Sequence, residues 1–79
     1  MSATVTNIAA YLFVSLNDLP SLRERLLQQA VALSLKGTVL LAEEGINLFL
    51  AGQAEDIESW LAALRADPRF APLEVKYSL

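Results

Sequence analysis

The feature that most constrains the fold of this chain is the order in which its hydrophobic periodicity changes. Apolar residues alternate along residues 8–16 and recur every three or four positions from Leu19 to Leu33. Two short apolar runs follow at 38–42 and 46–51, then a second helical stripe at 57–64 and renewed alternation at 73–79. A period of two is typical of strands, and a period of three to four is typical of amphipathic helices. The sequence therefore predicts the order β-α-β-β-α-β.

Local signals mark the ends of these elements. Asn17 and Asp18 are candidate N-caps for the first helix. Residues 43–45 (EEG) separate the two middle strands, which predicts a β-hairpin whose glycine supplies a positive φ. Asp67 precedes Pro68 and should end the second helix, because the residue before proline avoids the α region. The predicted fold class is α+β, a ferredoxin-like sandwich with a four-stranded antiparallel sheet and two helices on one face.

One face of such a sheet packs against the helices and the other is left open. The residues predicted to face the helices are Leu12, Val14, Val39, Leu41, Leu48, Leu50 and Val75. The residues predicted on the open face are Tyr11, Phe13, Leu40 and Phe49. Aromatic rings on an open sheet occur in RNA-recognition domains, but the basic and Gly-aromatic signature of those domains is absent and the net charge is −3. Coverage by another domain or a second copy is the favoured interpretation.

The composition excludes several kinds of active site. The chain has no cysteine and no histidine, which removes thiolate nucleophiles, imidazole bases, disulfides and the usual zinc sites. Glu43 and Glu44 are adjacent at a hairpin tip, where their carboxylates should diverge rather than converge on one atom. An acylphosphatase needs an arginine in a glycine-rich loop after the first strand, and residues 15–18 contain neither. No catalytic, cofactor-binding or metal-binding residue, and no cofactor, is predicted within this chain.

Length and targeting signals set the remaining expectations. The 79 residues are expected to form one domain. No apolar run approaches the roughly 18 residues of a membrane span, so no membrane partner is expected. The N-terminus lacks the basic region of a signal peptide, which predicts a cytoplasmic protein.

Several segments together resemble one known family. They are residues 36–52 (KGTVLLAEEGINLFLAG), 65–70 (RADPRF) and 73–78 (LEVKYS), with the opening 9–16 (AAYLFVSL). This pattern resembles the N-terminal acylphosphatase-like domain of the rhodanese-related tRNA uridine hydroxylases. The resemblance implies a ferredoxin-like domain that precedes a rhodanese domain. It also implies a whole protein that hydroxylates the wobble uridine of tRNA at carbon 5 with molecular oxygen. Many members read EGINGT where this chain has Leu48 and Phe49, which makes its third strand more apolar.

The resemblance carries over no catalytic residue, because the essential cysteine of the family lies in the rhodanese loop and this chain contains no cysteine. The leading hypothesis is that residues 1–79 are a non-catalytic accessory domain at the N-terminus of a larger enzyme. Its expected partners are the rhodanese domain of the same protein and, through the full-length protein, tRNA. The alternatives are a stand-alone acylphosphatase-like enzyme and a self-associating regulatory module. The candidate interaction-surface residues are Tyr11, Phe13, Phe49, Glu44, Gly45 and Asn47.

Overall fold

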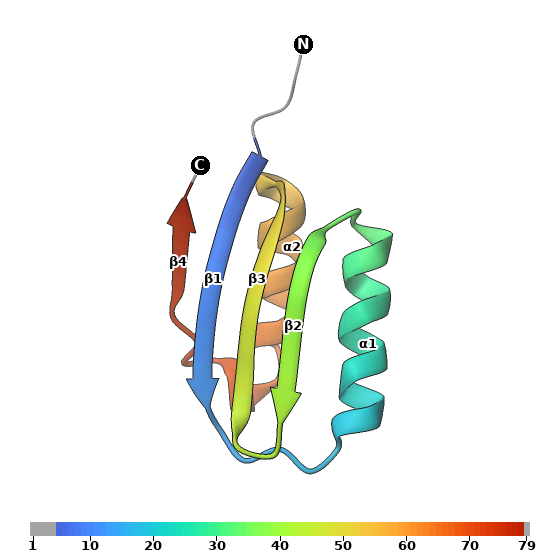
Figure 1. The fold of residues 1–79 in the computed structure, drawn as a ribbon, viewed down its shortest axis with the longest axis vertical. Helices are drawn as coiled ribbons and strands as arrows, with labels where there is room; N and C mark the ends of the chain where they lie inside the picture. Colours follow the sequence, from blue (N-terminus) through green and yellow to red (C-terminus); the bar gives the residue numbers. More distant parts are fainter. Residues whose placement is uncertain (1–4, 79) are drawn as a thin grey trace.

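The computed structural model describes residues 5–78 as a four-stranded antiparallel sheet with α1 and α2 on one side (Figure 1). The elements, in order, are β1 (Val5–Phe13), α1 (Leu19–Ala32), β2 (Lys36–Ala42), β3 (Gly45–Gln53), α2 (Ala54–Arg65) and β4 (Val75–Ser78). A single 3₁₀ turn, Pro68–Phe70, connects α2 to β4. The sheet order is β2-β3-β1-β4, which places β1 and β3 in the centre. The predicted ferredoxin-like order and fold class are confirmed.

The hydrophobic core lies between the sheet and the two helices. On β1 and β3 the register places Ile8 opposite Leu50 and Ala10 opposite Leu48, and all four side chains are buried. Successive strand residues point to opposite faces, so this pairing directs one complete row of apolar side chains toward the helices. The structure confirms that the alternating residues face the helix layer.

The two helices meet at Trp60, which is fully buried. Its indole N–H donates a hydrogen bond to the carbonyl oxygen of Leu26 at 3.2 Å, which links α2 to α1 across the core. A buried indole finds a hydrogen-bond partner because an unsatisfied buried donor is unfavourable. Trp60 is therefore a core residue, as the helical stripe predicts.

The bounds of all four strands differ from the sequence prediction. The two middle strands, predicted at 38–42 and 46–51, are longer and span Lys36–Ala42 and Gly45–Gln53. The alternation predicts a first strand at residues 8–16, but this strand spans Val5–Phe13. Beyond Phe13 the backbone still pairs, because the amides of Val14 and Leu16 donate to the carbonyl oxygens of Glu44 and Glu43 at 2.8 and 2.9 Å. These bonds go to the hairpin turn instead of to a strand, and the regular ladder ends there. The alternation therefore continues past the strand itself.

The last strand is predicted at residues 73–79 and spans Val75–Ser78. Leu73 is buried in the core before the strand begins, and residue 79 lies outside the described residues. Tyr77 falls in the apolar row but is 52% exposed. Its hydroxyl donates to the carboxylate of Glu58 on α2 at 2.8 Å, and this hydrogen bond raises the pKa of the Tyr77 phenol. Tyr77 thus lies at the edge of the helix layer and not in the core.

Within residues 5–78, neither helix has the length and apolar composition needed to cross a lipid bilayer.

Candidate functional site

The surface of the sheet that faces away from the helices is the candidate site, and we call it the open face. Strand residues alternate between the two sheet faces, so the outward positions follow from the observed register and the buried row. The residues of the open face come from all four strands. They are Val5, Asn7, Ala9, Tyr11 and Phe13 on β1; Lys36, Thr38, Leu40 and Ala42 on β2; Gly45, Asn47, Phe49, Ala51 and Gln53 on β3; and Lys76 and Ser78 on β4.

The end of the open face next to the β2–β3 turn is apolar, and we call it the aromatic end. Four large side chains there are exposed for more than half of their surface: Tyr11 at 67%, Phe13 at 82%, Leu40 at 57% and Phe49 at 54%. The rings of Tyr11 and Phe13 contact each other edge to face, with centroids 5.9 Å apart. Contiguous exposed apolar patches in a folded domain usually mark an interaction site. The four residues predicted on the open face all lie there.

The structure brings the six candidate interaction residues together. Five of them (Tyr11, Phe13, Glu44, Gly45 and Asn47) line one shallow hollow of about 380 Å³ beside Leu40. The sixth, Phe49, lines an adjoining hollow of about 680 Å³ with Tyr11, Phe13 and Asn47. Asn47 on β3 pairs with Tyr11 on one side and with Leu40 on the other. The candidates therefore form one continuous surface that runs from the centre of the sheet to the hairpin turn.

Three of the candidates belong to the EEGIN segment, and their surroundings differ. A Cβ atom on Gly45 would overlap the carbonyl oxygen of Leu12 on the neighbouring strand, so any side chain is excluded. The φ of Gly45 is 158°, close to extended, and the close approach of β1 is the stronger reason for glycine. Glu44 is exposed at the turn, as predicted. Asn47 is exposed, and its side chain makes no hydrogen bond among residues 5–78.

The loop after β1, where an acylphosphatase would require its arginine, is occupied by an ion-pair cluster that the sequence did not reveal. Arg69, from the 3₁₀ turn, contacts Asp18 at 2.7 Å and Asp67 at 2.7 Å. Arg25 on α1 lies 3.8 Å from Asp67. The hydrogen bonds from Arg69 lower the pKa of both carboxyl groups, and these carboxylates raise the pKa of Arg69. The guanidinium of Arg69 is thus committed to two carboxylates.

The same cluster corrects the prediction for Asp18. Asp18 occupies the N-cap position of α1, but its side chain makes no capping hydrogen bond. The carboxylate contacts Arg69 instead, because a charge-assisted bidentate contact is stronger than a bond to a backbone amide. Asp67, by contrast, accepts the Arg69 amide and caps the 3₁₀ turn. Across residues 5–78 no three acidic side chains are grouped in a way that could hold a metal ion.

Solved structures share the fold of this chain. BlrP1 BLUF superimposes with a TM-score of 0.74 over 99% of this chain and 57% of its own, at 22% sequence identity. The de novo designed protein Ferredog-Diesel superimposes with a TM-score of 0.67 over 100% of this chain and 88% of its own, at 8% identity. At such low identity the likeness concerns the fold alone.

Sequence relatives are much closer. The chain is 67% identical over 75 residues to a protein of Bordetella avium named tRNA uridine(34) hydroxylase, and 55% identical over 74 residues to one of that name from Xanthomonas campestris. It covers 95% and 94% of its own length in these matches but only 31% and 29% of the relatives. The chain thus spans about a third of the length of these proteins. The model of the UPF0176 acylphosphatase-like domain matches residues 5–79. The chain therefore belongs to the UPF0176 acylphosphatase-like N-terminal domain family, whose relatives here are tRNA uridine(34) hydroxylases.

Proposed function

We propose that this chain is the non-catalytic N-terminal domain of a larger tRNA uridine hydroxylase, called the parent protein below, and that its aromatic end docks against the remainder of the same polypeptide. The observation that carries the proposal is the exposure of Tyr11, Phe13, Leu40 and Phe49 on one sheet face. The relatives are named for a tRNA uridine substrate, and the chain spans about a third of their length. A large partner segment is therefore available within the same molecule. A tRNA substrate also favours the cytoplasm as its location.

The size of the aromatic end favours an intramolecular partner over a second copy. Side chains of this kind bury about 150–250 Å² each when fully covered, so the exposed parts of these four offer roughly 400–600 Å². A stable interface between separate proteins buries about 800 Å² on each partner. A covalently linked segment acts at a millimolar effective concentration and needs less area. The segment proposed here is the rhodanese domain that the family resemblance implies, and this domain would supply the catalytic cysteine.

The stand-alone acylphosphatase interpretation is the weaker one. The loop at residues 15–18 has neither the glycine nor the arginine that phosphate binding after the first strand requires. The guanidinium nearest to this loop, Arg69, is held by Asp18 and Asp67. An anionic substrate would have to displace these two carboxylates before it could contact the arginine.

Cysteine labelling tests the docking directly, because the chain contains no cysteine of its own. Phe13→Cys is introduced into the 79-residue chain and into the parent protein, and the rate of maleimide modification at this position is followed by peptide mass spectrometry. Val31→Cys on α1 is the matched control, since Val31 is 68% exposed on the helix layer. We expect modification at position 13 to be at least tenfold slower in the parent protein, and modification at position 31 to be unchanged.

Equal rates at position 13 in the two proteins would contradict the docking. Slower labelling of the 79-residue chain at rising concentration would instead indicate self-association, which also contradicts the docking.

The accessory role has a separate test. The parent gene carrying Phe13→Asp is returned to a strain that lacks this gene, and the tRNA of the strain is digested and analysed for hydroxylated uridine. We expect a marked loss of the modification, whereas Val31→Asp should retain it.

A further inference from the structure

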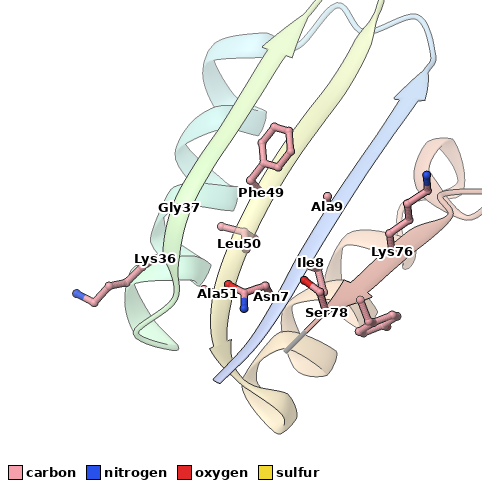
Figure 2. Close-up of a pocket in the computed structure, with 11 residues that line it drawn as sticks. Asn7, Ile8, Ala9, Lys36, Gly37, Phe49, Leu50, Ala51, Lys76 and Ser78 are labelled. Atoms are coloured by element: carbon pink, nitrogen blue, oxygen red, sulfur yellow. The ribbon is translucent and has the colours of Figure 1, made fainter. Parts of the chain in front are cut away.

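The end of the open face away from the hairpin turn has a different chemistry from the aromatic end. Both lysines of the chain lie there, Lys36 at the start of β2 and Lys76 on β4. They flank a hollow of about 390 Å³, with Asn7, Ser78 and Phe49 between them (Figure 2). Because β2 and β4 are the two edge strands, three strand spacings separate the lysines, or about 14 Å. We call this region the lysine end.

Charge is segregated between the two sides of the domain. The net charge is −3, but many of the carboxylates lie on the helix side, including Glu55, Asp56 and Glu58 of α2. Among residues 5–78 neither lysine forms an ion pair, whereas Arg69 and Arg25 contact Asp18 and Asp67 on the helix side. No carboxylate among residues 5–78 lines the hollow between the lysines, and Glu74 lines the adjoining hollow with Lys76. The local charge at the lysine end is therefore positive.

The surface between the lysines is a shallow hollow in which polar side chains lie among apolar ones such as Phe49 and Ala51. Ala51 on β3 pairs with Asn7 on β1, and Asn7 pairs with Ser78 on β4, so small and hydrogen-bonding side chains connect the two edges. An apolar protein surface laid over this region would have to bury two ammonium groups without partners, which is strongly unfavourable. A chain of phosphate groups brings the opposite charge and accepts hydrogen bonds from lysine, asparagine and serine.

We propose that the lysine end binds the phosphate backbone of the tRNA substrate, with Lys36 and Lys76 each contacting a phosphate group. This inference rests on the proposed function, in that the parent protein acts on tRNA. It assigns the two ends of the open face to different partners. The aromatic end packs against the remainder of the polypeptide, and the lysine end stays accessible next to it. The domain would then bind tRNA next to the docked segment that carries the catalytic site.

The test measures tRNA affinity of the full-length parent protein against salt concentration. The wild type is compared with Lys36→Gln, Lys76→Gln and the double variant, and Arg23→Gln, an exposed cation on α1, is the charge-matched control. Two lost phosphate contacts should reduce the slope of log affinity against log salt by about 1.4, which corresponds to about 25-fold weaker binding at about 0.1 M salt for the double variant. The Arg23→Gln variant should keep the wild-type slope. Thermal melting checks that all variants remain folded.

The outcomes separate this inference from the proposed function. If the wild type binds tRNA and the double variant keeps the same slope, the inference is overturned and the proposed function stands. A further result would also overturn the inference. The double variant could keep the salt slope and, when it also carries Phe13→Cys, react faster with maleimide at position 13. That result would mean that the lysines contact the docked protein segment and not tRNA. A wild-type parent protein that binds no tRNA would overturn both.

Discussion

The exposure of Phe13 leads to a quantitative expectation for the 79-residue chain. Full burial of a phenylalanine is worth about 1.5–3 kcal/mol, and Phe13 is 82% exposed, so it contributes less than a fifth of that, or about 0.3–0.5 kcal/mol. Replacement by serine also loses strand preference, by up to about 1 kcal/mol. We therefore expect Phe13→Ser to reduce the free energy of unfolding by about 1 kcal/mol and to improve solubility. Phe70, which is fully buried, is the contrast: Phe70→Ala should cost about 3–5 kcal/mol.

Urea denaturation provides the measurement, because the single tryptophan, Trp60, is buried and its fluorescence reports unfolding. Both variants are compared with the wild type at one protein concentration and again at a tenfold higher one. A loss of more than about 2 kcal/mol for Phe13→Ser would refute the reasoning, because it would make Phe13 a core residue of the chain on its own. In the parent protein, docking should make the same substitution more destabilising.

Three further changes test other contacts. Trp60→Phe removes the hydrogen bond to Leu26 and some core volume, so we expect a loss of about 1–3 kcal/mol in urea denaturation followed by circular dichroism; unchanged stability would contradict the link between the helices. Gly45→Ala forces a Cβ atom into a backbone carbonyl, and its melting temperature should fall by an amount that corresponds to about 1–3 kcal/mol or more; a wild-type value would contradict the close approach. Arg69 lowers the pKa of Asp18 below its ordinary 3.8, so this contact stabilises the fold fully above about pH 4 and is lost as the pH falls further. Asp18→Asn should therefore lose less stability than the wild type during acid titration of the melting temperature, and parallel titration curves would argue against the contact.

The sequence predicted the elements that depend on local pattern. Alternation along the first strand placed Ile8 and Ala10 toward the helices and Tyr11 and Phe13 on the open face, because the side-chain period of a strand is two wherever it begins. The fold class followed from the order of the elements, and Trp60 was placed in the core by the helical spacing of its neighbours.

The contacts that the sequence did not predict are formed between residues far apart in the chain. The local pattern predicts Asp18 as an N-cap, but it cannot show Arg69, 51 positions away, which competes for the carboxylate. The shared position of Lys36 and Lys76 on the open face could have been inferred from strand alternation. The hollow between the two lysines could not be predicted without the sheet order, which places β2 and β4 at opposite edges. The predicted strand ends were wrong because the hydrophobic alternation extends into loops that are fixed by other contacts.

The glycines at the two ends of the β2–β3 hairpin have a consequence for how this surface can diversify. Gly37 has a φ of 133°, and a Cβ atom there would overlap the carbonyl oxygen of Phe49, as one on Gly45 would overlap that of Leu12. A shift of one residue would move a side chain into each of these contacts and turn the aromatic row inward, so the two glycines fix the pairing of the strands. The alignment of the strands is thus enforced by two positions that carry no side chain. The outward residues between them can be exchanged without disturbing the scaffold, so a new binding preference can arise from single substitutions in this hairpin.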